Sequence, residues 1–318
     1  MSTTVFARAT VLTREQWQAQ EAVHVARAEA LTAGHRARAA RSVQHPVEDF
    51  LFTYYSYKPK VLRRWHPGVG VELADAHARA CWRWYTSGDA PGTARVDAAA
   101  YRAEKATLID AVHRILHSTA GRTGRFGCFG LHEWAMVYRD GAHRHPLPLR
   151  LGQQATDAVV ESHELRCTHF DAFRFFTPAA VPRNAQPLRR DTAPDAEQPG
   201  CLHANMDLYK WAIKLGPLVP GALLLDAFEL ARDIRTLDMA ASPYDLTEWG
   251  LAPVPIETAA GKAEYVHRQR GFAQRADLLR RRLLDVLDDG PLWCRPSRPD
   301  AACGYGGMTA AAEGVDDP

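Results

Sequence analysis

The first half of the chain carries two patterns of polar and apolar residues that predict helices. Thr13 is followed three positions later by Gln16, which is the spacing of a capping box, and an Ala- and Arg-rich stretch then favours a long helix to about Gly34 or beyond. Further along, apolar residues recur at the three- and four-residue steps that place side chains on one face of a helix. This second pattern predicts a helix with a buried face over residues 98–118, and its apolar positions are Leu108, Val112, Ile115 and Leu116.

Two longer amphipathic patterns lie in the last third of the chain. The first predicts a helix whose buried face is formed by Leu224, Ala227, Phe228, Ala231, Ile234 and Leu237. The second covers residues 258–288, with arginines opposite an apolar face of Phe272, Ala276, Leu279, Leu283 and Val286. Strands do not alternate with these helices as they would in a parallel sheet. The pattern therefore predicts a mainly α fold.

Glycine and proline interrupt the helical patterns. Residues 121–130 are rich in glycine, which favours irregular or extended backbone, and the five prolines of residues 178–200 predict a long surface loop or lid. Residues 295–318 are rich in Gly, Ala, Pro and Asp, a composition typical of a disordered tail. We therefore expect a single globular domain over residues 1–294. A few short strands or extended loops would surround a centre rich in His, acidic and aromatic residues, at about 126–215.

Composition narrows the class of protein. The chain has 318 residues, of which 46% are hydrophobic and 24% charged, and its net charge is +2. This near balance argues against a nonspecific nucleic-acid binder but allows a local basic cleft. No stretch reaches the roughly 18 uninterrupted apolar residues of a membrane span. The six cysteines form no CxxC pair, which is typical of a reduced protein, so we expect a cytoplasmic protein with no membrane partner.

Histidines and carboxylates gather in the centre of the chain. The segments ESHELRCTHFDAFRFFTP and CLHANMDLYKWAIK supply the neutral nitrogen and anionic oxygen ligands that Fe and Zn bind. The residues proposed for such a site are His163, His169, Asp171 and His203. A structural alternative remains open, in which Thr168 caps one helix with Asp171 in its first turn, and Asn205 caps the next helix.

Between residues 45 and 68, a run of aromatic residues is followed by a run of basic residues. Aromatic rings stack on unpaired bases and cations bind phosphates, so this composition is typical of a nucleic-acid groove. A buried helix with a solvated basic end would give the same pattern. The residues predicted to contact DNA are Tyr54, Tyr55, Lys58, Lys60, Arg63, Arg64 and Trp65.

Several long runs of the sequence resemble an actinobacterial family usually labelled 3-methyladenine DNA glycosylase. The runs are HPVEDFLFTYYSYKP, RRWHPG, FGCFGLHEWAMVYR, CTHFDAFRFFTP, QPGCLHANMDLYKWA, LARDIRTLDMAASPYDL and GKAEYV. The resemblance covers about residues 14–288. It implies a DNA-repair enzyme that hydrolyses the N-glycosidic bond of alkylated purines such as 3-methyladenine, with double-stranded DNA carrying alkylated bases as its partner.

Removal of an alkylated base makes few chemical demands, because the cationic base is already a good leaving group. The enzyme must flip the base out, hold it against aromatic rings and supply a carboxylate. We predict Glu133 or Asp171 as that carboxylate and expect no cofactor. The side chains predicted to bind the base are His132, Trp134, Tyr138, Phe170, Asn205 and Tyr209.

The alternative function is a mononuclear Fe or Zn enzyme that acts on a small molecule. Its ligands would be the histidines and the aspartate proposed above, and residues 178–200 would form its lid.

Overall fold

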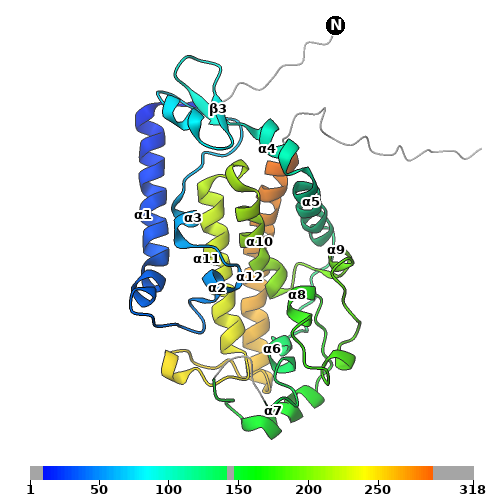
Figure 1. Ribbon diagram of the computed structural model, residues 1–318. Helices are drawn as coiled ribbons and strands as arrows, with labels where there is room; N and C mark the ends of the chain where they lie inside the picture. Colours follow the sequence, from blue (N-terminus) through cyan, green and yellow to red (C-terminus); the bar gives the residue numbers. More distant parts are fainter. Residues whose placement is uncertain (1–9, 142–146, 289–318) are drawn as a thin grey trace, which may run out of the picture. The chain divides into compact units, whose positions relative to one another are not determined.

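A computed structural model describes residues 10–141 and 147–288 of the chain. These residues form one compact unit, which is mainly helical and carries a small four-stranded sheet (Figure 1). The prediction of a mainly α single domain is confirmed. The tail predicted at residues 295–318 lies outside the described residues. No helix among the described residues is both long enough and apolar enough to cross a lipid bilayer.

Five long helices form the frame of the unit: α1 (Arg14–Ala39), α5 (Ala106–Ala120), α10 (Leu202–Lys214), α11 (Gly221–Ala240) and α12 (Ala259–Asp288). Helices α10, α11 and α12 pack against one another, α1 packs on α11, and α5 packs on α12 (Figure 1). The predicted capping box of α1 is confirmed. Thr13 Oγ1 accepts from the Gln16 backbone nitrogen, and Gln16 Oε1 accepts from the Thr13 backbone nitrogen. Most of the core follows the apolar faces of α10 and α11, with fully buried residues such as Leu208, Leu225 and Ile234.

The shorter helices connect and cover this frame. They are α2 (Phe50–Tyr54), α3 (Pro59–Arg63), α4 (Ala98–Glu104), α6 (Leu131–Ala135), α7 (Gly152–Glu161), α8 (Phe170–Phe173) and α9 (Ala193–Ala196). Single 3₁₀ turns are η1 (His77–Cys81), η2 (Val181–Arg183), η3 (Gly216–Leu218) and η4 (Thr247–Trp249). The Pro-rich stretch at 178–200 is mostly loop, as predicted, and is interrupted by η2 and α9.

The four strands come from the first third of the chain: β1 (Thr10–Leu12), β2 (Val71–Leu73), β3 (Tyr85–Ser87) and β4 (Ala94–Val96). Their order in the sheet is β1-β2-β4-β3. Strand β1 is parallel to β2, with Val11 opposite Glu72, and the other two pairs are antiparallel. The sheet encloses a separate small cluster around Trp17 and Trp65, so it anchors the N-terminal end of α1.

Three local predictions need correction. The helix expected over residues 98–118 is two helices, α4 and α5, because the backbone leaves helical geometry at Lys105. Helix α8 begins after His169 and its cap forms no side-chain bond, so Thr168 does not cap it. Asn205 does not cap α10 either, because the N-cap of that helix is Cys201 and Asn205 lies inside it. The Asn205 side chain instead donates to the Pro199 carbonyl oxygen and accepts from Arg280.

Candidate functional site

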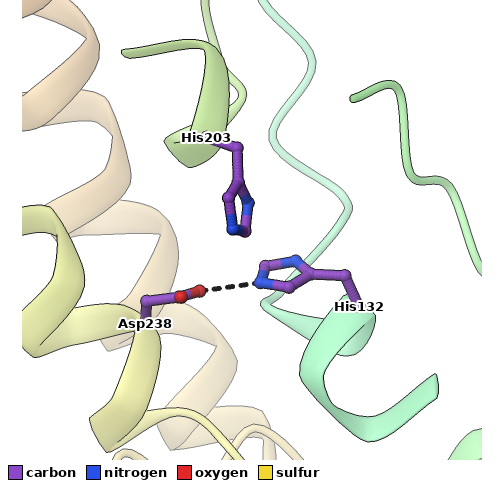
Figure 2. A group of neighbouring side chains, drawn as sticks. All are labelled: His132, His203 and Asp238. Atoms are coloured by element: carbon purple, nitrogen blue, oxygen red, sulfur yellow. Dashed lines mark hydrogen bonds and ion pairs between the residues drawn. The ribbon is translucent and has the colours of Figure 1, made fainter. Parts of the chain in front are cut away.

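Three side chains from three helices meet in the interior of the unit. His132 comes from α6, His203 from α10 and Asp238 from α11, and their potential ligand atoms all lie within 4.8 Å of one another (Figure 2). Within the described residues, they form the group of His, Cys, Asp or Glu side chains that could hold a metal ion. Gly130, with φ of 73°, turns the chain into α6, and a Cβ there would lie 3.3 Å from the Tyr265 ring. Glycine is therefore suited to the turn that places His132.

A buried chain of charges extends from His132 along α11. The imidazole donates from Nε2 to Asp238 Oδ1 over 2.8 Å, and the second oxygen of Asp238 accepts from Arg235 at 2.8 Å. The same Arg235 nitrogen donates to Glu133 Oε1 at 2.9 Å, and its guanidinium lies 3.8 Å from the centre of the Phe50 ring. Burial alone would lower the pKa of His132, but the Asp238 charge and hydrogen bond outweigh it and raise that pKa well above its ordinary value. The two carboxylates are thus held by positive partners.

His203 differs from its two neighbours because it has no such partner. Neither of its ring nitrogens is hydrogen-bonded to another residue in the described parts of the chain. Its ring meets that of His132 edge-on, with centroids 4.4 Å apart, and stacks on His169 at 5.3 Å. Burial, and then the positive charge of His132, lower the pKa of His203 well below its ordinary value. The side chain is therefore a neutral imidazole with a free lone pair, aimed at the His132–Asp238 pair (Figure 2).

Cavities connect this group with the surface. An outer cavity of about 500 Å³ is lined by Arg125, Phe126, Gly127, Cys128, Glu164, Arg166, Cys167, Thr168, Ala185, Gln186 and Gln198. It shares five of these residues with an inner cavity that reaches His132 and His203: Cys128, Arg166, Cys167, Thr168 and Gln198. Cys128 Sγ lies in this passage, 3.9 Å from Nδ1 of His132. The outer cavity thus adjoins a small inner cavity of about 10 Å³ that His132 and His203 help to line.

A second buried cluster surrounds Asp207, one turn further along α10. The carboxylate accepts from the Tyr55 hydroxyl at 2.7 Å and from His169 Nε2 at 3.2 Å, and it pairs with Lys210. Glu197 lies 3.6 Å from the same His169 nitrogen. Burial raises the pKa of Glu197 to about 7. These contacts fix the His169 ring on which His203 stacks.

The predicted metal ligands are only partly brought together. His203 belongs to the group of three, and His169 lies beside it but is bound to Asp207. His163 is not part of the group, because it follows the end of α7 and its Nδ1 bonds the Val159 carbonyl oxygen at 2.7 Å. Asp171 is also outside it, and its carboxylate lies 3.6 Å from Lys210. Of the four predicted ligands, only His203 therefore belongs to the group that the structure brings together, whose other members are His132 and Asp238.

Four of the side chains predicted to bind a base are enclosed by protein. Trp134 is 0% exposed and its Nε1 donates to the Ala241 carbonyl oxygen, while Tyr138 is 1% exposed. Tyr209 and Asn205 are both 0% exposed. None of these four has a face open to a stacked base, because the core packs against them. Of the other two, Phe170 is half-buried beneath Arg190, and His132 belongs to the group of three.

The predicted catalytic carboxylates lie on one small cavity of about 20 Å³, which Glu133, Asp171, Phe50, Tyr54, Phe175, His203 and Arg235 help to line. Glu133 is 3% exposed and bound to Arg235. Asp171 is half-buried, and Arg174 and Arg190 each approach it to 3.5 Å. A cavity of this size holds a water molecule but not a nucleobase.

The predicted DNA contacts separate into surface and interior residues. The four cations, Lys58, Lys60, Arg63 and Arg64, are exposed on and around α3. The aromatic residues are not, since Trp65 is 5% exposed within the cluster beneath the sheet, and Tyr54 and Tyr55 are half-buried. The aromatic residues of this block therefore pack inward, and the cations alone form a surface.

Sequence reasoning missed Arg235 and Asp238. Both fall at helical spacing beside the predicted apolar face of α11, which includes Ala231 and Ile234. Charged residues within an apolar face are costly to bury without partners. That combination was the signal by which they could have been found.

Comparison of the chain with protein-family models, with curated proteins and with solved structures gives no match.

Proposed function

We propose that the protein is a metal-dependent enzyme that acts on a small molecule, with Fe or Zn held by His132, His203 and Asp238. The observation that supports this most is His203, a neutral imidazole without a partner that faces a histidine and an aspartate across less than 4.8 Å. Two imidazoles and one carboxylate are a donor set that suits both ions. An ion with this set has coordination positions left for a substrate or water, which it polarises as a Lewis acid.

Residues next to the three ligands would hold them in position for the metal ion. Arg235 binds the second oxygen of Asp238, and Glu133 binds Arg235 in turn, so the carboxylate is held in one orientation. Cys128 approaches the nitrogen of His132 that faces away from Asp238. Contacts of this kind behind metal ligands fix their orientation and contribute to metal affinity.

The test is the metal content of purified protein, measured by inductively coupled plasma mass spectrometry without a metal-binding tag. We expect about one Fe or Zn per chain and a loss of at least tenfold in metal affinity in His203→Ala and Asp238→Asn. His163→Ala is the matched control, because this histidine lies outside the group. Absence of metal, or equal metal content in His203→Ala and in the unchanged protein, would contradict the proposal.

A second candidate function, a DNA N-glycosylase for alkylated purines, is favoured by the exposed cations around α3. Lys58, Lys60, Arg63 and Arg64 lie close together in the sequence and are solvent-accessible, as phosphate contacts must be. Asp171 is the more accessible of the two carboxylates. This function requires that the protein excises 3-methyladenine from duplex DNA. The excision activity should persist in the presence of a chelator, weaken as the salt concentration rises and be lost in Asp171→Asn. Excision that disappears with the metal would contradict it.

Either function fits the cytoplasm. The four cysteines in the described residues, Cys81, Cys128, Cys167 and Cys201, are all free thiols. Free thiols persist in a reducing compartment. We therefore propose a cytoplasmic enzyme.

A further inference from the structure

The outer cavity has a size and a position that suit a substrate site. Its volume of about 500 Å³ falls within the range of small-molecule pockets. The passage to His203 runs between Cys128, Cys167 and Gln198, which line both cavities. The inner cavity has a volume of only about 10 Å³, so of a molecule bound in the outer cavity it admits a single small group towards His203.

Hydrogen bonds of the Gln198 side chain hold one wall of the outer cavity in place. Its Oε1 accepts from the backbone nitrogens of Arg125 and Gly200, each at 2.7 Å, and its Nε2 donates to the Arg125 carbonyl oxygen at 3.3 Å. A side-chain carbon at Gly200 would collide with that carbonyl oxygen. Gln198 is 4% exposed, so this clamp is part of the interior. The loop that carries Arg125 is thus held at the rim of the cavity.

The charge of the cavity wall is positive. Two arginines, Arg125 and Arg166, and one acid, Glu164, line it. Arg166 donates from Nη2 and Nε to Glu164 Oε2 at 2.5 and 2.9 Å, which leaves its Nη1 without a bond to another described residue and able to donate to an anion. The exposed side chain of Arg125 has no ion pair with another described residue. Its guanidinium is therefore free to bind an anion.

The inner site would also favour an anion once a divalent ion is bound. The charges of Arg235 and Glu133 cancel, His132 as a metal ligand is neutral, and Asp238 offsets one of the two positive charges of the ion. A buried excess of positive charge is stabilised by an anionic partner. The outer and inner ends of the path therefore select the same sign of charge.

We infer that the substrate is a small anionic molecule, a carboxylate or a phosphate ester, bound by Arg125 and Arg166 in the outer cavity with its reacting end directed to His203. This inference rests on the proposed metal-dependent function, which it extends by a substrate class.

The test measures anion binding to protein loaded with Co²⁺, by calorimetry and by the visible absorption of the ion. The probes are inorganic phosphate and succinate, and the one that binds more tightly identifies the anionic group. We expect the preferred anion to shift the Co²⁺ absorption and to bind at least about tenfold more weakly to Arg125→Gln and Arg166→Gln. Arg189→Gln is the control, because Arg189 is exposed, pairs with Asp191 and does not line the cavity.

The metal content of each variant separates the two proposals. Suppose that the metal content is normal. The substrate inference is then overturned if the protein binds no anion, or if both arginine variants bind the anion as tightly as the unchanged protein does. The proposed metal site is unaffected by either result. If the protein takes up no metal, the proposed function fails. Calorimetry on the metal-free protein then tests the outer cavity alone. Anion binding that depends on Arg125 supports the anionic class of its ligand, and binding independent of Arg125 overturns the inference.

Discussion

Replacement of Arg235 by methionine should destabilise the protein strongly. The guanidinium is 1% exposed and is shared by two buried carboxylates, Glu133 at 2.9 Å and Asp238 at 2.8 Å. Methionine has a similar length and fills much of the same volume, so loss of packing is small. The change therefore measures what happens when two buried acids lose their cation.

The magnitude follows from the two partners. Removing one member of a buried ion pair costs about 3–5 kcal/mol, because the other charge stays buried without compensation. Asp238 keeps His132 as a partner, so most of the cost comes from Glu133. Loss of the guanidinium from the Phe50 ring, 3.8 Å away, adds about 1 kcal/mol. We expect a total of about 4–6 kcal/mol, which is a large part of the usual stability of a domain.

The assay is urea unfolding of chelator-treated protein, followed by far-ultraviolet circular dichroism and analysed by linear extrapolation. Arg232→Met is a matched control on the same helix, since Arg232 is exposed and pairs with Asp233, and it should change stability by less than about 0.5 kcal/mol. Adding Glu133→Gln to Arg235→Met should restore part of the loss, because it removes the uncompensated charge.

A loss below about 1 kcal/mol in Arg235→Met, or a loss equal to that of Arg232→Met, would refute this reasoning. It would mean that the carboxylates reach water or bind protons at little cost. The double variant separates these cases, because partial rescue occurs only if Glu133 is ionised and enclosed.

Two further predictions concern stability. Asn205→Leu should cost about 1–3 kcal/mol in the same unfolding assay, because the buried Arg280 would lose the amide oxygen that accepts from it at 2.6 Å; an unchanged midpoint would contradict this. Burial opposes the ionisation of Asp49, but hydrogen bonds from Arg38 and His35 prevail and lower its pKa from 3.8 to about 2. The stability that this carboxylate contributes, about 2 kcal/mol, is complete above pH 3.8 and is lost as the pH falls to about 2. Asp49→Asn should therefore be less stable than the unchanged protein at pH 6 and equal to it near pH 2, as measured by thermal unfolding, and an equal deficit at both pH values would contradict it.

The frame of the fold was predictable because its signals are local. The capping box of Thr13 and Gln16 and the apolar face of α11 are complete within a few turns of helix, and both are present in the structure. The break between α4 and α5 at Lys105 was not predictable, because the residues around it favour helix and the apolar spacing continues across it. Tertiary packing decides such breaks.

The candidate site was predicted in its region but not in its members. His132 and His203 both stood out as histidines near acids, but the acid that meets them, Asp238, comes from a helix that was predicted to be purely structural. Trp134 was misjudged for a related reason. A tryptophan beside an acid suggests an exposed stacking surface, yet α6 is buried on all sides and its Trp134 is core. Which long-range segments converge is a property of packing, and sequence spacing does not contain it.

The distance along the chain between the converging side chains affects how the protein is made. His132 and Asp238 are 106 positions apart in the sequence, and α1, near the start of the chain, packs on α11. During synthesis, α6 leaves the ribosome long before α11, so Glu133 and His132 wait without their charged partners while the rest of the chain is translated. The enclosed charges can be assembled only in the final stage of folding, after residue 240 has emerged. A chain cut short before that point would lack the helices on which α1 and α5 pack, and its polar interior would stay open to water and to chaperones.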